Sequence, residues 1–474
     1  MKTIIGKRVL LTIINYLLLF SVTCLGFTLS AYDLTFKLNK TEKSTFRQTD
    51  AAALALIRQS AHKLSGSAKD YDPLMKMIGD ARFVLLGEAT HGTHEFYRER
   101  ARITRRLIEE KGFDAVVLEA DWTDAYRVNE YVQAKSKDQT AEKSLSSFTR
   151  FPRWMWRNTD FRDLVGSIRS FNDSQQPEAK KVGVYGMDLY GLAESIREVT
   201  EYLRRIDPEA AKRAVKRYGC LTSYRTNPQQ YGYDVSARMT KSCETEVAEQ
   251  FQEMEQRFAA WQNNSQRERD DNLFSAYQSS RVVKNGEAYF RLSYQRNFST
   301  WNLRDNHMAD TIHALAAYLD FVGNSKSKIV IWAHNTHQGD ARMTTMGETG
   351  ELNVGYLMRK AAGENSVLIG FTTYTGRVLA ASEWGAEGFT MRVRPALTGS
   401  YSRLFHDSGI PNFLLIFRGN ERLTEELGST RLERAIGVIY RPQTERQSHY
   451  FGARMSKQFD AVIHFDTTTA VKPL

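Results

Sequence analysis

Cysteine and proline are scarce in this sequence. Its 474 residues include only 3 Cys and 9 Pro, which excludes a small disulfide-dense scaffold and a proline-rich disordered chain. Hydrophobic residues make up 42% and charged residues 25%, a balance typical of globular proteins. The sequence therefore predicts a folded protein with a sizeable core.

A basic cluster with interleaved aromatic residues is also lacking. The net charge of +10 is spread over the whole chain, and the densest basic stretch, residues 97–106 (YRERARITRR), fits a solvated helix face. Nucleic acid is therefore not an expected partner.

The first 31 residues have the layout of an export segment. Lys2, Lys7 and Arg8 precede an apolar stretch over residues 9–27, and small residues come before Tyr32. This pattern predicts a secretory signal peptide or an uncleaved membrane anchor, followed by a Lys- and Thr-rich tether at residues 32–50. We expect a protein exported to the periplasm or the extracellular space, or anchored to the cytoplasmic membrane, that contacts a membrane only through this segment.

Two cysteines, Cys220 and Cys243, lie beyond the export segment. An even number of cysteines in an oxidising compartment favours pairing, and closing the loop between them would stabilise the fold by roughly 3 kcal/mol. Two separate buried thiols are the alternative.

Short β-branched runs alternate with longer helical patterns over residues 51–474. This alternation predicts an α/β fold with a mostly parallel sheet flanked by helices. A helix-rich insertion is expected at about residues 194–319. The expected strands are Phe83–Leu86, Ala115–Leu118, Val182–Tyr185, Ile329–Trp332, Val367–Phe371, Phe413–Phe417, Ile436–Tyr440 and Ala461–Phe465.

Unusual polar residues follow four of these strands. Ligands of open α/β sheets bind beyond the carboxyl ends of the strands, so side chains at these ends are expected to converge on one crevice. Each residue taken singly also fits a helix cap or a first-turn acid. The residues concerned are Glu88, His91 and His94, then Glu119, Asp121 and Trp122, then Asp188 and Tyr190, and finally His334 and His337.

Arg100 is an independent indication of a buried polar network. The helix expected at residues 94–111 has its apolar stripe at Phe96, Ile103 and Leu107, and the spacing puts Arg100 on the same stripe. A buried charge requires a partner, and Glu88 and Glu119 are the nearest candidates. A side chain that reaches out to water is the alternative.

The sequence lacks the signatures of several hydrolase classes. It has no Gly-x-Ser-x-Gly elbow and no His-Glu-x-x-His zinc motif, and neither Cys220 nor Cys243 follows an expected strand. Water activated by histidine remains, with His91 as the base and Glu88 either orienting it or accepting the proton. Arg100, His334 or His337 would stabilise the oxyanion.

A divalent metal is the sharpest alternative to this chemistry. The two His-x-x-His pairs and two glutamates supply ligand types suited to a metal-assisted hydrolase. An arginine in the same network would repel a cation, so we expect no metal and no other cofactor.

Five stretches resemble the erythromycin (macrolide) esterase family, which includes proteins named for succinoglycan biosynthesis. These stretches are GEATHGTHEFYRER, VVLEADW, YGMDLY, WNLRDNHMAD and WAHNTH. The resemblance implies a sheet-based hydrolase that adds water to a carboxylic ester or macrolactone without a covalent intermediate. It also implies His91 as general base beside Glu88, an active-site Arg100 and Glu119, and a histidine pair at His334 and His337.

The resemblance further implies a small-molecule ester or lactone as substrate. We expect the substrate to contact Trp122, Asp188, Tyr190 and Arg304. The export segment and the insert that carries Cys220 and Cys243 depart from the cytosolic macrolide-resistance enzymes of the family. A non-catalytic envelope protein is the remaining alternative, in which the histidines and aromatic residues hold a glycan or a tetrapyrrole; those aromatic residues are Trp122, Tyr190, Trp301 and Trp384. The sequence does not indicate an oligomeric state.

Overall fold

The computed structural model describes residues 50–176, 179–266, 268–295 and 298–474. The chain divides into two compact units, Met1–Leu56 and Ile57–Leu474. In the first unit the described residues, 50–56, are helical. The predicted export segment and all but the last residue of the predicted tether lie outside the described residues. Every described helix is too short or too polar to cross a membrane.

Nine strands of the second unit form one sheet within the described residues. The strand order is β1-β8-β11-β6-β2-β5-β3-β4, with β7 paired to β6. The bounds are β1 His62–Lys63, β2 Phe83–Leu86, β3 Ala115–Asp121, β4 Gly183–Asp188, β5 Ile329–Trp332, β6 Ser366–Ala380, β7 Phe389–Val393, β8 Asn412–Ile416 and β11 Ala461–Thr468; β9 Arg431–Arg434 and β10 Tyr450–Ala453 form a separate hairpin.

The run from β11 to β4 is parallel, and only β1, β7 and β8 are antiparallel to their neighbours among these strands. The predicted fold class is therefore confirmed. The strand predicted at Ile436–Tyr440 is wrong. Ile436 and Ile439 make isolated bridges to Thr90 and Ala381 instead, because this segment crosses between two elements rather than lying along one.

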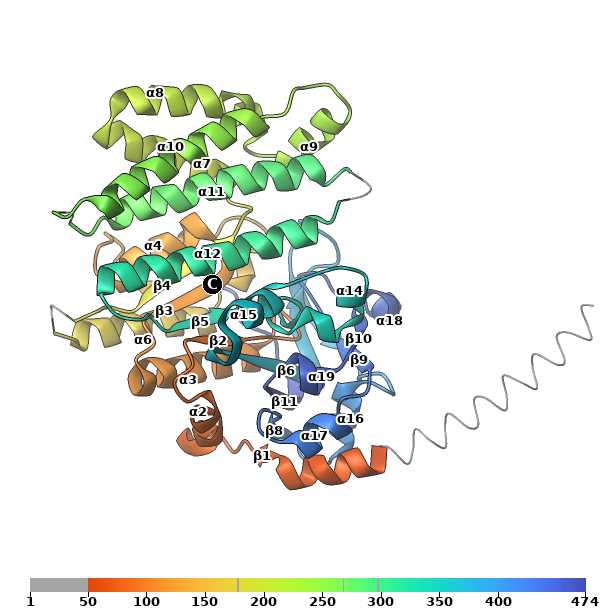
Figure 1. The fold of residues 1–474 in the computed structure, drawn as a ribbon. Helices are drawn as coiled ribbons and strands as arrows, with labels where there is room; N and C mark the ends of the chain where they lie inside the picture. The colour runs from red at the N-terminus through yellow and green to blue at the C-terminus, as the bar shows by residue number, and fades with distance from the viewer. Residues whose placement is uncertain (1–49, 177–178, 267, 296–297) are drawn as a thin grey trace, which may run out of the picture. The chain divides into compact units, whose positions relative to one another are not determined.

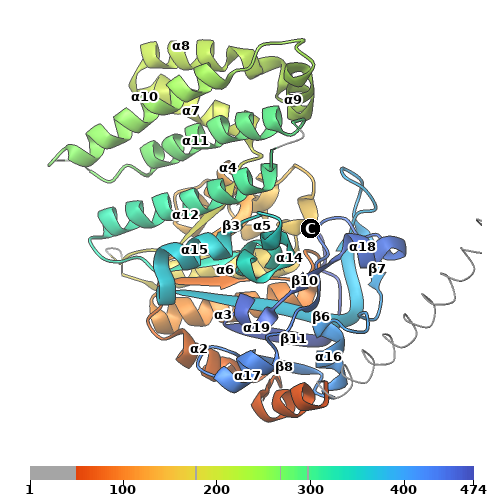
Figure 2. The same cartoon turned by 45° about the vertical axis from the view of Figure 1, so that its right-hand side comes forward.

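Helices cover both faces of the sheet. Figures 1 and 2 show α12 and α15 on the opposite side of the sheet from α3. The helix bounds are α2 Asp72–Ile78, α3 His94–Lys111, α4 Trp122–Val132, α5 Ala141–Ser144, α6 Thr159–Ser174, α7 Leu192–Ile206, α8 Pro208–Arg217, α9 Pro228–Ser236, α10 Glu244–Asn263, α11 Asp271–Leu292, α12 Thr300–Gly323, α13 Asn335–Gln338, α14 Thr345–Glu348, α15 Val354–Ala362, α16 Tyr401–Asp407, α17 Glu421–Glu426, α18 Glu445–Ser448 and α19 Met455–Gln458.

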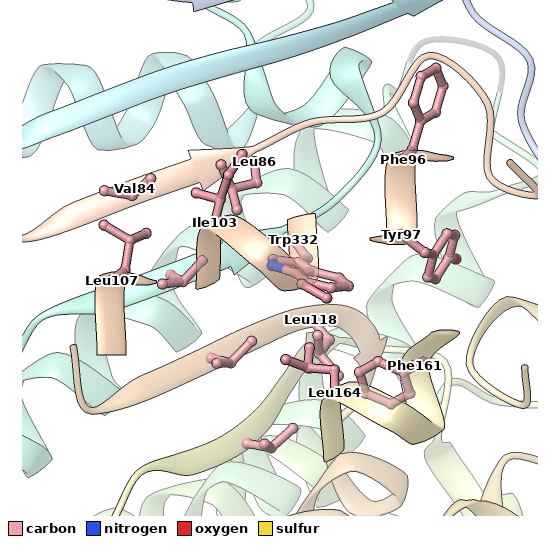
Figure 3. Packing of buried hydrophobic residues seen from close by; sticks show 14 of the residues in the cluster. Val84, Leu86, Phe96, Tyr97, Ile103, Leu107, Leu118, Phe161, Leu164 and Trp332 are labelled. Atoms are coloured by element: carbon pink, nitrogen blue, oxygen red, sulfur yellow. The ribbon is translucent and has the colours of Figure 1, made fainter. Parts of the chain in front are cut away.

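One core cluster of buried residues lies between the sheet and the helices α3 and α6. Alternate residues of the strands face it, as expected for a pleated strand. Ile103 and Leu107 of α3 pack against Val84, Leu86 and Trp332 of the strands (Figure 3). Burial of each such side chain contributes about 1.5–3 kcal/mol. This packing fixes α3, and therefore Arg100, near the carboxyl ends of β2 and β5.

The helices α7 to α11 form a layer beyond α12 in both views of the ribbon (Figures 1 and 2). α11 packs against α7 and α10, and it also contacts α4 and α12. In this layer Cys220 and Cys243 form the predicted disulfide, with their Cα atoms 6.0 Å apart.

Candidate active site

Four neighbouring parallel strands end at the same edge of the sheet. These strands are β2, β5, β3 and β4, in that order, and the predicted polar residues lie at or just beyond their ends. The turn after β2 requires two glycines. A Cβ on Gly87 would collide with the Asn335 side chain, and one on Gly92 would collide with the Leu379 backbone. The Gly-Glu-x-x-His-Gly stretch therefore fits here only because the residues at its two ends, Gly87 and Gly92, have no side chain.

A cavity of about 330 Å³ opens at this edge. Its wall combines titratable side chains with aromatic ones, an arrangement common in small-molecule sites. The polar wall comes from four strand ends, the loop before α6 and the start of α12. The titratable lining residues are His91, Glu119, Asp121, Asp124, Arg150, Asp188, Tyr190, Arg304, His334 and His337.

A buried carboxylate, that of Glu88, contacts the ring of His91. The Nδ1 of His91 lies 2.9 Å from Oε1 of Glu88. Glu88 is fully buried and His91 is 6% exposed. Because Nδ1 is engaged with Glu88, Nε2 is the ring nitrogen left to face a ligand. A carboxylate at Nδ1 fixes the tautomer and the orientation of the ring.

Arg100 is the third member of a triad with Glu88 and His91. Its side chain points inward, as predicted. Its Nη2 donates to Oε2 of Glu88 at 2.6 Å, and the guanidinium lies over the rings of Tyr97 and Trp332 at 4.6 and 4.5 Å. Arg100 is fully buried and does not line the cavity. It therefore acts on Glu88 and not on a substrate.

Glu119, the second predicted glutamate, belongs to a different network. Its Oε1 accepts from Nη2 of Arg304 at 2.8 Å, and its Oε2 accepts from the backbone N–H of His334 at 2.9 Å. Burial opposes ionisation, but His337, His91 and Arg304 outweigh it and hold the pKa of Glu119 well below its usual value. Arg304 also forms a two-pronged pair with Asp188, at 2.9 and 2.6 Å.

His337 lies between two carboxylates. Its Nδ1 is 2.9 Å from Oδ1 of the buried Asp305, and its Nε2 is 3.4 Å from Oε1 of Glu119. Burial lowers the pKa of His337, but Asp305 and Glu119 outweigh it and raise that pKa to about 9. Trp301 stacks on the ring with centroids 4.4 Å apart. Both nitrogens of His337 are thus engaged within the protein.

His334, unlike His337, has only one of its two ring nitrogens engaged within the described part of the protein. Its Nδ1 accepts from the backbone N–H of Thr336 at 3.3 Å, which leaves the proton of the neutral ring on Nε2. This Nε2 has no hydrogen-bond partner among the described residues. Burial and the charge of His91 hold the pKa of His334 well below its usual value. The two imidazole rings lie with centroids 4.9 Å apart, so a neutral N–H donor stands beside the candidate base.

Two predicted site residues point elsewhere. His94 pairs with Asp160, with Nδ1 2.8 Å from Oδ1, and does not line the cavity. Trp122 donates to Ser275 Oγ at 3.0 Å and stacks on Tyr126 and Tyr185. Both residues start helices, so the first helical turn aims their side chains away from the strand ends.

Three residues of the site were not predicted. Asp305 follows Arg304 in α12 and faces His337, whereas Asp124 and Arg150 line the cavity. Asp124 stands three residues after Asp121, a spacing that places both on one face of α4 and that the sequence shows. Arg150 lies in an irregular loop, for which the sequence offers no periodic signal.

A model of the erythromycin esterase family matches residues 108–468. The α/β fold with this site at the strand ends therefore defines a protein of the hydrolase class represented by that family. The chain belongs to the erythromycin esterase family.

Relatives at low sequence identity agree with this assignment. The erythromycin esterase type II of Escherichia coli is 21% identical over 427 residues, which cover 84% of this chain and 93% of that protein. A crystal structure of a succinoglycan biosynthesis protein superposes with a TM-score of 0.70 at 22% identity and covers 89% of this chain and 98% of that one. A mutant of the erythromycin esterase EreC in its open conformation gives 0.61 at 17% identity, covering 85% and 94%. These structures show that the fold is shared.

Proposed function

We propose that this protein hydrolyses a carboxylic ester or lactone by direct attack of water activated at His91. The observation that carries the proposal is the buried series Arg100–Glu88–His91, which holds an imidazole on the cavity wall with one nitrogen free. A base fixed in this way suits general-base catalysis. The family assignment supports a hydrolase, and the names of the erythromycin esterase relatives support an ester bond as its target.

The proposed reaction begins with the transfer of a proton from water to Nε2 of His91 as the water oxygen bonds to the carbonyl carbon. The carbonyl oxygen becomes an oxyanion, and the Nε2–H of His334 is placed to donate to it. The carbon–oxygen ester bond then breaks, and the leaving alkoxide takes the proton from His91. The products are one carboxylic acid and one alcohol, without an acyl-enzyme.

His337 has a supporting role in this proposal. The sequence left the oxyanion role open between Arg100, His334 and His337. Arg100 lies behind Glu88, and His337 is engaged at both nitrogens, so His334 is the favoured donor. His337 and Arg304 together keep Glu119 ionised, and Glu119 positions the backbone of His334.

Metal-free chemistry is also part of the proposal. Both oxygens of Glu88 are engaged by His91 and Arg100, and both oxygens of Glu119 are engaged by Arg304 and His334. No group of three His, Cys, Asp or Glu side chains in the described part of the chain is arranged to hold a metal ion. Activity after exhaustive chelation tests this part, because a metal-assisted hydrolase would lose turnover and regain it on metal addition.

The experiment that tests the function incubates the purified full-length protein with a panel of macrolides, lactones and simple esters. Mass spectrometry is expected to find products heavier by one water from lactones, and an acid and an alcohol from open esters. Intact-protein mass spectra during turnover are expected to show no acyl adduct. Binding without any product would instead support the non-catalytic envelope protein, and a stable adduct would contradict direct attack by water.

We also propose that the protein acts outside the cytoplasm. The disulfide between Cys220 and Cys243 supports this location, because such bonds persist mainly in oxidising compartments.

A further inference from the structure

The cavity has an acidic corner that the proposed reaction does not use. Asp121 and Asp124 lie at the start of α4, and both line the cavity. Asp121 is 4% exposed and Asp124 is 9% exposed. Neither carboxylate belongs to the triad of His91 or to the network around Glu119, so the corner requires a separate explanation.

Helix capping does not account for these two acids. Asp121 occupies the N-cap position of α4, yet its side chain makes no capping hydrogen bond within the described residues. Its Oδ2 accepts from Arg150 Nε at 2.8 Å, whereas its Oδ1 is buried and unpartnered in the described structure. The carboxyl group of Asp124 has neither a hydrogen bond nor an ion pair to any described residue.

A buried carboxylate without a partner is costly unless a ligand supplies one. The acidic side chains around Asp124 affect its ionisation more strongly than the basic ones. Asp121 and Glu194 oppose its ionisation, and Arg150 and Arg197 favour it less strongly. Burial, followed by the charges of Asp121 and Glu194, raises the pKa of Asp124 to about 8. Burial also raises the pKa of Asp121, which Arg150 lowers and Asp188 and Glu194 raise.

The surroundings favour an organic cation over a metal ion. The loop that contains Ser147 lies against Asp124, because Ser147 Oγ donates to the Asp124 backbone carbonyl at 3.3 Å. The next residue, Phe148, lines the cavity together with Phe151. Aromatic faces beside a carboxylate suit an alkylated ammonium group, which gains from both charge and ring contact. Two carboxylates with aromatic neighbours do not offer the oxygen-rich shell that hard metal ions require.

We propose that Asp121 and Asp124 form a subsite for a protonated amine carried by the substrate, with Asp124 as its direct partner. This inference rests on the proposed function, since it assigns a chemical class to the substrate of the same cavity. The amine binds the corner formed by α4 while the ester lies against His91 and His334.

Binding can be tested without turnover on the purified full-length protein. The probe is phenylpropyl(dimethyl)amine, and phenylpropanol is its uncharged comparison compound. Calorimetry at pH 7 is expected to give about 10- to 100-fold tighter binding of the amine, as expected of a charge-assisted hydrogen bond. The amine is also expected to release a proton as Asp124 ionises, which titration in two buffers of different ionisation enthalpy measures. Equal affinities of the two probes would overturn the proposal.

Variants assign the effect to Asp124. Asp124→Asn is expected to abolish most of the preference for the amine and the proton release, whereas Asp163→Asn, at an exposed acid on α6, is expected to preserve both. Circular dichroism confirms folding, and Asp124→Ser replaces the variant if Asn does not fold. An unchanged preference in a folded Asp124 variant would refute the assignment. Because the probes carry no ester, failure of amine binding is distinguishable from failure of ester hydrolysis in the substrate panel.

Discussion

Arg100 and Glu88 form an ion pair 2.6 Å long in which neither side chain has any exposed surface. Two aromatic rings, those of Tyr97 and Trp332, flank the guanidinium. The pair joins α3 to the turn after β2 and fixes the carboxylate that holds His91. Fold stability and alignment of the candidate base therefore depend on the same contact.

Replacing Arg100 by Met is expected to destabilise the protein by about 3–5 kcal/mol, because Glu88 would keep a buried and unpaired charge. Urea unfolding at pH 7 measures the change. Arg105→Met, at an exposed position of the same helix, is expected to remain within about 0.5 kcal/mol of the wild type. A loss as small as that of the control would show that Glu88 does not depend on Arg100.

Replacing His91 by Ala is expected to lower kcat roughly 10²–10⁴-fold, the effect of losing a general base. The thermal unfolding midpoint is expected to change little, because His91 borders a cavity. His94→Ala is the matched control, since His94 pairs with Asp160 away from the cavity. Turnover of His91→Ala near that of the control would remove His91 from the proposed role.

The architecture and the inward orientation of Arg100 could be predicted from the sequence, because both follow from local patterns. The positions of β2 and β5 and the bounds of α3 follow from apolar runs and helical spacing, which are local signals. Arg100 was placed correctly because it interrupts an apolar stripe. Its partner was left open between Glu88 and Glu119, because the distance between two strand ends depends on strand order, which local patterns do not encode.

Strand order also explains why Glu119 is not the partner of Arg100. Glu119 is one of the two candidate partners that the sequence offers for Arg100, but β5 separates β2 from β3, and Glu119 pairs with Arg304 of the distant α12 instead. The segment Ile436–Tyr440 has the composition of a strand, but among the described residues it makes only isolated bridges, to Thr90 and Ala381. Such outcomes depend on tertiary contacts.

Glu433 provides a pH-dependent prediction. It lies in β9, is 1% exposed and accepts from Asn335 Nδ2 at 3.2 Å, and burial raises its pKa to about 8. A carboxyl whose folded pKa exceeds its unfolded value of about 4.3 stabilises the fold at low pH, and this contribution is lost as the pH rises toward 8.

Glu433→Gln is therefore expected to be more stable relative to the wild type at pH 8 than at pH 5. Urea unfolding of both proteins at the two pH values measures the difference. Glu383→Gln, in an exposed loop, controls for loss of a surface charge. A relative stability that does not change with pH would show that Glu433 titrates normally in the fold.

Loss of the disulfide is expected to destabilise the helical layer formed by α7 to α11. Cys220→Ser would remove a link that closes a loop with a sequence separation of 23 residues, worth about 3 kcal/mol in the chain-entropy picture. Mass spectrometry with and without reductant checks that the bond forms in the wild type, and urea unfolding measures the loss. Two free thiols in the wild type would contradict the pairing.

The long strand β6 extends beyond the parallel part of the sheet and pairs with β7. The turn between them carries Trp384, which lines the cavity, is 57% exposed and contacts Phe151 with ring centroids 5.1 Å apart. This turn is joined to the rest of the sheet through β6 and lies outside the contacts of Glu88 and His91. Its sequence and length can therefore diverge independently of the proposed catalytic residues, which makes this hairpin a suitable site for engineering substrate selectivity by loop exchange.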